Sequence, residues 1–307
     1  MARAKQKPQI MQMSIAEWEK TFPDEDACRD YLIAHRWPEG VACPRCGNTN
    51  VHPHGTLEYH WQCYACSPGG VGYRFSVLVG TIFENTNKPL RQWFRVIHLM
   101  LTSKKGISAR QVHRYMGFGS LKTAWYMCHR IRAGLVDREF QKLMGIVEVD
   151  ETFIGGKAKN RHKDKRGDGS GGTGGMGKEI VAGAVSRKGN VVARVIENVR
   201  ATTLTEFVRE SVSTKVSLLC TDKWVGYKHL NKEFPQHAMV DHAKGQYVVG
   251  AVHTQTIEGF WSIVKRGMVG TFHKVSAKYL PLYVAEFQFR YNNRANRDIF
   301  GTAISGC

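Results

Sequence analysis

The sequence predicts an α/β fold with a mixed sheet, preceded by a small metal-binding module and a helical region. Three observations predict it. Residues 145–157 have the alternating apolar and polar side chains of a β-strand. Two Cys-x-x-Cys pairs lie between residues 43 and 66, with the spacing of a structural zinc site. Between these two features, residues 88–140 show helical periodicity interrupted by a short turn that contains glycine.

Residues 145–157 (GIVEVDETFIGGK) form the strand around which the rest of the chain is arranged. β-branched and aromatic side chains suit a pleated sheet, and here they alternate with polar ones. Glu148, Asp150 and Thr152 therefore share one face of the strand. Carboxylates on an otherwise apolar strand are unfavourable unless a cation or hydrogen-bond donors meet them. The alternative is an edge strand with a solvated face.

The net charge favours a polyanionic partner. The chain has 44 Lys and Arg against 26 Asp and Glu, which gives a formal charge of +18. Basic residues occur in every segment and mix with aromatic ones, a pattern that favours nucleic acid over an anionic membrane surface or a merely basic protein. No apolar run is long enough to span a bilayer, and the basic start lacks the apolar core of a signal peptide. We therefore expect an intracellular protein.

Residues 1–40 are expected to form an N-terminal helical segment. Residues 1–12 are basic, polar and without periodicity, which predicts disorder. The spacing from Ser14 to Glu17 is that of a capping box and begins a short helix. A second helix follows Pro23, with acidic residues in its first turn. No chemistry is assigned to this segment.

Residues 41–87 are predicted to form a zinc ribbon. Two Cys-x-x-Cys pairs, sixteen residues apart, provide its ligands, which are Cys43, Cys46, Cys63 and Cys66. Each pair offers two thiolates from one turn, and two pairs complete a closed tetrahedral site for structural Zn²⁺. Free or redox-active thiols are the alternative, and the histidines between the pairs are ligands only if a cysteine is not used. Such a ribbon either binds nucleic acid or is purely structural.

Residues 88–140 are predicted to form a helix-turn-helix-like DNA-binding region. Apolar residues recur at helical spacing from Leu90 to Leu101. One helix then ends at Gly117, and a second follows a short turn. The polar positions of this second helix include Lys122, His129, Arg130 and Arg132. An ordinary αα-hairpin is the alternative to a DNA-reading motif.

Further elements of the sheet domain follow the first strand. They are two strands at 179–185 and 191–199 joined by a hairpin turn, a helix at 202–212, and a buried strand at 216–222 that ends in Asp222. A basic, glycine-rich segment precedes them and nearly matches a phosphate-binding loop. Glu179 stands where such a loop needs Ser or Thr, and no strand-to-helix context surrounds it, so nucleotide binding is rejected. No function is attached to the glycine-rich tract at 167–177.

Residues 256–268 are predicted to form an amphipathic helix. Glu258 and Lys265 lie opposite its apolar stripe. Seven residues at about 100° each bring these two side chains within about 20° of each other, two turns apart. A solvated polar face is the alternative for this helix taken by itself.

The order of the acidic residues indicates a ribonuclease-H-like catalytic domain over residues 141–307. Asp150 lies on the first strand, Asp222 ends a neighbouring strand, and Glu258 approaches from a helix packed on the sheet. Three carboxylates that converge there can hold two Mg²⁺ or Mn²⁺ ions about 3.5–4 Å apart, with the substrate phosphate supplying the remaining ligands.

Six longer motifs extend this interpretation along the chain. They are RWPEGVACPRCG (36–47), FSVLVGTIFENT (75–86), VDETFIGGK (149–157), TDKWVGY (221–227), HTQTIEGFWSIVKRG (253–267) and EFQFRYNNR (286–294). With these motifs the chain resembles prokaryotic insertion-sequence transposases of the DDE superfamily, in the ISXO-like group with an N-terminal zinc ribbon. The similarity runs nearly end to end, although Gln255 stands where the family more often has Asn.

The resemblance implies a DNA transposase that binds the terminal inverted repeats of an insertion sequence and catalyses metal-dependent strand cleavage and strand transfer. Asp150, Asp222 and Glu258 would be the triad that holds Mg²⁺ or Mn²⁺. Lys265 would be a fourth signature position that contacts DNA near the cleaved phosphate. The expected partners are double-stranded DNA, from element ends and target, and further copies of the chain in a dimeric or larger synaptic complex. A cytoplasmic, nucleoid-associated location follows.

Two other functions stay open at this point. A non-catalytic regulator could use the ribbon and the helix-turn-helix alone, although this leaves the order of the acidic residues unexplained. A resolvase-like or RNA-directed nuclease could use the same fold. Within the catalytic domain, the neighbouring acids Glu148, Glu151 and Asp241 are expected to tolerate amide substitution better than the triad does.

Overall fold

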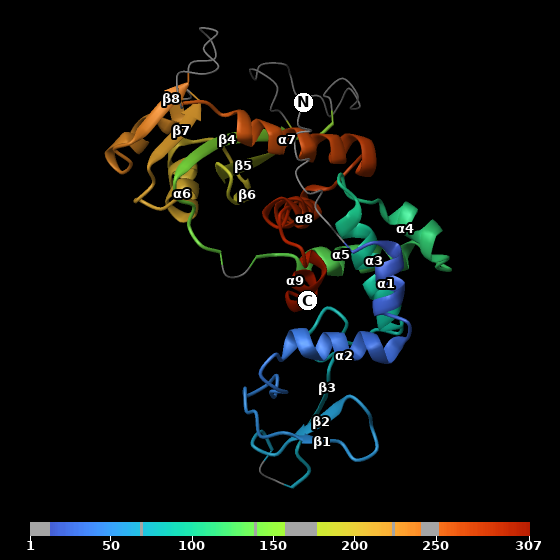
Figure 1. Cartoon of the computed structure of the whole chain (residues 1–307). Helices are drawn as coiled ribbons and strands as arrows, with labels where there is room; N and C mark the ends of the chain where they lie inside the picture. Colours follow the sequence, from blue (N-terminus) through green and yellow to red (C-terminus); the bar gives the residue numbers. More distant parts are fainter. Residues whose placement is uncertain (1–12, 68–69, 138–139, 157–176, 223–224, 241–251) are drawn as a thin grey trace, which may run out of the picture. The chain divides into compact units, whose positions relative to one another are not determined.

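The computed structural model describes residues 13–67, 70–137, 140–156, 177–222, 225–240 and 252–307. The chain divides into two compact units, one of Met1–Val136 with Arg294–Cys307 and one of Asp137–Asn293, and Figure 1 labels the α-helices and β-strands of each. The expectations for residues 1–12 and for the glycine-rich tract up to residue 176 lie outside the described residues.

The second unit is built on a five-stranded sheet in the order β6-β5-β4-β7-β8. Its strands are β4 (Ile146–Ile154), β5 (Glu179–Ser186), β6 (Val191–Ile196), β7 (Leu218–Asp222) and β8 (His237–Val240). β5 runs antiparallel to both β4 and β6, whereas β7 runs parallel to both β4 and β8. This mixed sheet is the ribonuclease-H-like arrangement, and it confirms the predicted α/β fold class.

Helices cover both faces of this sheet. They are α6 (Ala201–Ser211), η3 (Val225–Lys232), α7 (Gln255–Gly267), η5 (Met268–Phe272), η6 (Ala277–Tyr279) and α8 (Leu280–Asn292). On one face, α6 and η3 pack against Val147 and Val149 of β4. On the other face, α7 and α8 pack against β5 and β6. The polar side chains of β4 at even positions therefore lie on the face that α7 covers.

The elements predicted for this unit are present, and their bounds shift by a few residues. One such shift is at β6, which ends at Ile196 instead of residue 199. The side chain of Asn198 accepts hydrogen bonds from the backbone of Arg200 and the hydroxyl of Thr203, so a turn that leads into α6 replaces the end of the strand. Short polar side chains compete in this way with the strand's own hydrogen bonds.

The first unit begins with two capped helices, α1 (Ile15–Thr21) and α2 (Glu25–Arg36). Ser14 and Glu17 form the predicted capping box at α1, and Asp24 caps α2. α3 (Leu90–Thr102) follows the ribbon and buries most of its apolar stripe. The carboxylate of Glu25 accepts hydrogen bonds from the first amides of α3, at Leu90 and Arg91, and so links α2 to α3.

Two helices, α4 (Ala109–Met116) and α5 (Leu121–Gly134), form the expected hairpin. Gly117 ends α4 in the left-handed conformation with φ of 62°, which suits glycine because it has no Cβ. Ser120 caps α5. Two of the polar residues predicted on α5 are buried, since His129 is 7% and Arg132 is 1% exposed. These two side chains are therefore not accessible as part of a DNA-facing surface.

The structure differs from the predicted extent of the sheet domain at its C-terminal end. Residues 294–307 belong to the first unit, where α9 (Ile299–Ser305) packs against α2 and α3. Phe300 lies 5.4 Å from Phe22 and 5.5 Å from Phe94, measured between ring centroids. The apolar side chains of α9 are buried in an aromatic cluster of the first unit, so α9 joins that unit although it follows the sheet domain in the sequence.

No helix within the described parts of the chain is both long and apolar enough to cross a membrane.

Candidate active site and zinc centre

The pairing of β4 with β7 brings Asp150 and Asp222 side by side. The parallel ladder ends at Glu148 and Cys220, and Asp150 and Asp222 each follow two residues later on the same strands, close enough for the charge of Asp222 to act on Asp150. Neighbouring strands lie about 4.8 Å apart, and paired residues of parallel strands point to the same face. Both aspartates are half-buried. They therefore lie on the sheet face that α7 covers.

A glycine allows α7 to lie directly on this face. Gly183 of β5 pairs with Asp150 on the side away from β7. A Cβ atom added at Gly183 would lie 2.5 Å from Cζ2 of Trp261 and 3.1 Å from Cδ1 of Ile257, both on α7. No side chain fits there, so the helix is seated on the backbone of β5 next to Asp150.

Glu258 extends from the first turn of α7, one residue after Ile257. Its side chain is exposed, and its Oε1 accepts a 3.0 Å hydrogen bond from the hydroxyl of buried Thr254. The structure thus brings together the three predicted acids: Asp150 and Asp222 from adjacent strands, and Glu258 from the helix above them.

The electrostatics of Asp150 agree with this arrangement. Burial, together with the negative charges of Glu151, Asp222 and Glu258, raises the pKa of Asp150 from 3.8 to about 7. Like charges close together in a low-dielectric site disfavour ionisation in this way. A divalent cation would relieve the repulsion, and carboxylate oxygens are the ligands that Mg²⁺ and Mn²⁺ prefer. The donor set therefore suits such ions.

The three carboxylates do not form a closed cage around one ion. Among the described residues, only the four ribbon cysteines form a group of three or more ligand atoms that all lie within 4.8 Å of one another. The acids are more widely spread. This spacing leaves room for ligands from outside the protein, such as water or phosphate oxygens.

Glu148 has a structural role that the sequence did not indicate. It is fully buried, and its carboxylate accepts hydrogen bonds from the backbone amides of Thr256 and Ile257 and from Nε of Arg187. The only sequence signal was its position on the same strand face as Asp150. Its partners are 39 to 109 residues away, and no local pattern points to them.

Glu151 is a second acid whose surroundings the sequence did not reveal. Its Oε2 accepts a 2.6 Å hydrogen bond from the hydroxyl of Tyr227, which is fully buried in η3. Burial raises the pKa of Glu151, whereas this hydrogen bond lowers it. Burial, followed by the charge of Glu151, raises the pKa of Tyr227 well above its usual value. The third neighbouring acid, Asp241, lies outside the described residues.

Lys265 lies two turns after Glu258 on α7, as predicted. Its side chain is exposed. Seven residues correspond to about 10 Å along a helix axis, on nearly the same face. The ammonium group of Lys265 therefore lies about two turns from the carboxylate of Glu258 on an exposed face of α7.

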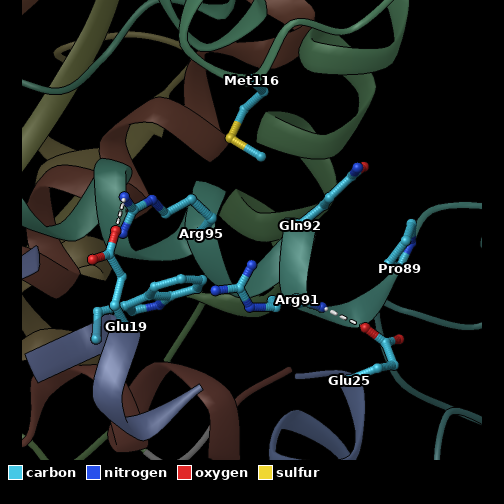
Figure 2. Close-up of a pocket in the computed structure, with 8 residues that line it drawn as sticks. Glu19, Glu25, Pro89, Arg91, Gln92, Arg95 and Met116 are labelled. Atoms are coloured by element: carbon cyan, nitrogen blue, oxygen red, sulfur yellow. Dashed lines mark hydrogen bonds and ion pairs between the residues drawn. The ribbon is translucent and has the colours of Figure 1, made fainter. Parts of the chain in front are cut away.

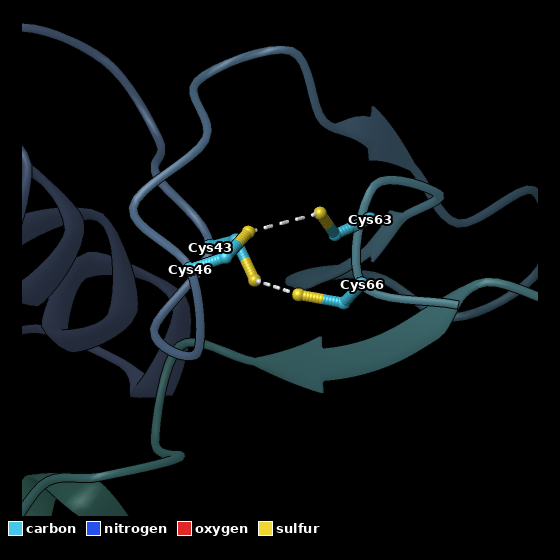
Figure 3. A group of neighbouring side chains, drawn as sticks. All are labelled: Cys43, Cys46, Cys63 and Cys66. Atoms are coloured by element: carbon cyan, nitrogen blue, oxygen red, sulfur yellow. Dashed lines mark hydrogen bonds between the residues drawn. The ribbon is translucent and has the colours of Figure 1, made fainter. Parts of the chain in front are cut away.

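Four cysteines of the first unit form the predicted zinc centre (Figure 3). They are Cys43, Cys46, Cys63 and Cys66. The Sγ atoms of Cys43 and Cys66 are 3.6 Å apart, and those of Cys46 and Cys63 are 3.7 Å apart. Tetrahedral zinc with Zn–S bonds of about 2.3 Å sets sulfur atoms about 3.8 Å apart. The geometry fits one structural Zn²⁺ bound by four thiolates.

A small sheet and an aromatic cluster support this centre. The strands are β1 (His52–Pro53), β2 (His60–Cys63) and β3 (Tyr73–Ser76), all antiparallel. Trp37, Trp61 and Phe75 pack behind Cys43 and Cys63. So small a core is insufficient for independent stability, which is consistent with a metal-dependent fold.

A hollow of about 420 Å³ opens elsewhere on the first unit (Figure 2). Trp18, Glu19, Arg91 and Arg95 line it, together with Glu25 and Gln92. Both arginines lie over the ring of Trp18, and Arg95 pairs with Glu19. The two acidic side chains and the two arginines in this hollow balance in charge.

Comparison with known proteins agrees with this architecture. Residues 142–292 match the ISXO2-like transposase domain, and residues 23–68 match the transposase zinc-ribbon domain. The fold and these matches define a transposase with a ribonuclease-H-like domain. The chain belongs to the ISXO2-like transposases, in the form that carries an N-terminal zinc ribbon.

A relative from a mobile element supports the assignment. The chain is 28% identical over 284 residues to a protein of Halobacterium salinarum described as an uncharacterized protein in transposable element ISH50. The alignment covers 88% of this chain and 92% of the relative. The two matching domains imply DNA as a partner.

Proposed function

We propose that this transposase binds the terminal inverted repeats of its element and catalyses divalent-metal-dependent cleavage and transfer of DNA strands. The observation that carries the proposal is the convergence of Asp150, Asp222 and Glu258 at one end of the sheet. The raised pKa of Asp150 supports it, because a catalytic carboxylate cluster needs a cation to neutralise it. Family membership agrees with this chemistry.

In this proposal the three carboxylates would hold Mg²⁺ or Mn²⁺, with two ions expected when DNA is bound. Such ions activate a water or 3′-hydroxyl nucleophile and stabilise the leaving oxygen of the phosphodiester. Asp150 and Asp222 provide rigid ligands because they are on paired strands. Glu258 provides an adjustable one because it is exposed at the start of a helix. A bound cation would favour the ionised form of Asp150.

DNA binding is assigned to the first unit and to the surface around Lys265. The zinc ribbon and the α4–α5 hairpin contact the DNA at the ends of the insertion sequence. The basic residues behind the chain's charge of +18 contact DNA phosphates. Two ends must be held together for transfer, so we expect a dimer or larger complex. The DNA substrate implies a cytoplasmic, nucleoid-associated protein.

Substitution of the triad tests the proposal. Asp150→Ala, Asp222→Ala and Glu258→Ala should each lower cleavage and strand transfer by roughly three orders of magnitude or more, as removal of a catalytic group does. Binding of end DNA should persist. The assay is nicking and joining of labelled end DNA in Mg²⁺ or Mn²⁺, with circular dichroism to verify folding.

Wild-type protein that binds end DNA but never cuts it in either metal would favour the non-catalytic regulator. Preference for branched DNA or an RNA:DNA hybrid over inverted-repeat ends would favour the nuclease alternative. Full cleavage by Asp150→Ala would show that another carboxylate is essential.

A further inference from the structure

Glu148 is a buried acid with an unusually complete set of hydrogen bonds. Oε2 accepts from the backbone amides of Thr256 at 2.7 Å and Ile257 at 3.0 Å. Oε1 accepts from the hydroxyl of Thr256 at 2.8 Å and from Nε of Arg187 at 2.6 Å. Nδ1 of His253 lies 3.3 Å from Oε1. Both oxygens are thus engaged by protein donors, so Glu148 is not available as a metal ligand.

These bonds replace a missing cap on α7. Thr254 occupies the N-cap position but makes no capping hydrogen bond with its side chain. The first amides of a helix lack partners within the helix, and a buried helix start needs acceptors from elsewhere. Glu148 of β4 supplies them from a different element. A negative charge at this position also complements the helix dipole.

Arg187 extends the connection to the remaining elements of the site. Its Nη2 donates to the backbone carbonyl of His253 at 3.1 Å, just before α7. The same nitrogen lies 3.9 Å from Sγ of Cys220 on β7, two residues before Asp222. The ion pair of Glu148 and Arg187 therefore connects β4 with β7 and with the segment that leads into α7.

The geometry points to Glu148 as a positioning residue for the metal-binding acids. It lies two residues before Asp150 on the same strand face, and Thr256 lies two residues before Glu258. The hydrogen bonds between Glu148 and Thr256 fix how far the first turn of α7 stands from β4, and so how far Glu258 stands from Asp150. The inference rests on the proposed function, because it concerns the geometry of the same three acids.

Substitution by glutamine tests it. Glu148→Gln keeps the size of the side chain, but its amide nitrogen must face either the backbone amides or Arg187, all of which are donors. The amides of residues 252–260 should then exchange hydrogen faster, and the Mg²⁺ concentration for half-maximal cleavage should rise roughly 10-fold or more, the effect expected for a residue that orients metal ligands. Affinity for end DNA should not change.

Glu286→Gln is the matched control. Glu286 is equally buried and pairs with Arg290, but both lie on α8. This variant should lose stability without altering the Mg²⁺ requirement or the exchange of residues 252–260. Equal shifts in both variants would overturn the inference, because they would show that general destabilisation is the cause.

Thr256→Val keeps the test decisive if Glu148→Gln does not fold. It removes only the hydroxyl bond to Glu148, so a smaller shift in the same direction is expected. An unchanged Mg²⁺ requirement together with unchanged exchange at 252–260 would overturn the inference. Hydrogen exchange and Mn²⁺-dependent thermal stabilisation do not need turnover. They therefore separate this inference from the proposed function, which is tested by the cleavage assays on wild-type protein and on the triad variants.

Discussion

At the scale of single residues, Asp150 links the stability of the protein to its metal site. Its pKa is about 7 in the folded chain against an ordinary 3.8, so the folded state binds more protons than the unfolded state between these values. In metal-free protein the contribution of Asp150 to the free energy of unfolding therefore decreases as the pH rises from 3.8 to about 7. Above that pH this contribution is constant. A bound cation would neutralise the repulsion between the carboxylates and so would prevent this loss of stability.

Asp150→Asn tests this linkage. The variant cannot ionise, so its melting temperature relative to wild type should increase with pH across that window, by roughly 2–4 °C for each kcal/mol of repulsion removed. Added Mg²⁺ should stabilise wild type and not the variant. Differential scanning fluorimetry at several pH values, with and without Mg²⁺, measures both effects. A stability difference that does not change with pH would contradict the prediction.

Lys265 is expected to act on DNA and not on metal. Lys265→Ala should lower strand transfer roughly 10-fold, the loss of a contact worth about 1.4 kcal/mol, at an unchanged Mg²⁺ requirement. Lys265→Arg should restore activity only in part, because a guanidinium fork does not replace a point charge. Arg266→Ala is the control, since the guanidinium of Arg266 bonds to Ser262 on its own helix. Full strand transfer by Lys265→Ala would assign Lys265 to a solvated face.

The sequence predicted the residues whose signal is local or ordered along the chain. The two cysteine pairs have a spacing that only a metal explains well, and the zinc centre is confirmed as a four-cysteine cluster. Asp150, Asp222 and Glu258 were selected by their order on strand, strand and helix. Glu148 and Glu151 were expected to tolerate amide substitution better than the triad does, and the sequence did not indicate that both are hydrogen-bonded to other elements of the unit. Arg187 is the partner of Glu148 and Tyr227 is the partner of Glu151, and these residues come close only when the sheet has folded.

At the scale of elements, the seating of α7 on the sheet depends on Gly183. Gly183→Ala would bring a methyl group within 2.5 Å of the ring of Trp261, so α7 must shift away from β5. Overpacking of this kind destabilises by about 1–3 kcal/mol. Because Glu258 moves with the helix, cleavage should fall more than stability alone explains. Chemical denaturation and cleavage rates at saturating DNA measure the two effects.

Gly259→Ala on the same helix is the control for stability. A Cβ at Gly259 meets open space, so this change should stabilise α7 by about 0.5–1 kcal/mol through helix propensity. Gly183→Ala protein with wild-type stability and cleavage would show that the helix can shift without consequence for the acids.

Most elements could be predicted because their periodicity is strong. The strand β4 and the apolar stripe of α7 appear in the structure where the pattern puts them, although burial along β4 does not alternate, because Glu148 and Thr152 are buried and Phe153 is exposed. Packing between distant elements could not be predicted in the same way. Arg132 on α5 has the chemistry of a DNA contact and is nevertheless 1% exposed, because tertiary contacts decide burial and sequence type does not. The same reason places α9 in the first unit.

At the scale of the whole molecule, the first unit is completed by the end of the chain. Ile299, Phe300, Ala303 and Ile304 are buried in it, and the carbonyl of Cys307 accepts a hydrogen bond from the amide of Ile82. A fragment of residues 1–135 therefore lacks part of its own core. DNA binding should be assayed on the full chain, where phosphate contacts predict a linear fall of log affinity with log salt concentration.

Truncation after Asn293 should destabilise the first unit and leave the second folded. Each buried Ile or Phe side chain contributes about 1.5–3 kcal/mol, so loss of α9 removes much of the stability of a domain this size. Calorimetry should show one unfolding transition shifted strongly to lower temperature, and end-DNA binding should weaken with it.

Phe300→Ala should destabilise the first unit less than the truncation does, by about 3–5 kcal/mol. Ile15→Ala is the control, since Ile15 is 57% exposed in the same unit and should be nearly neutral. Truncated protein with wild-type salt-dependent DNA binding would show that the first unit does not need its C-terminal helix.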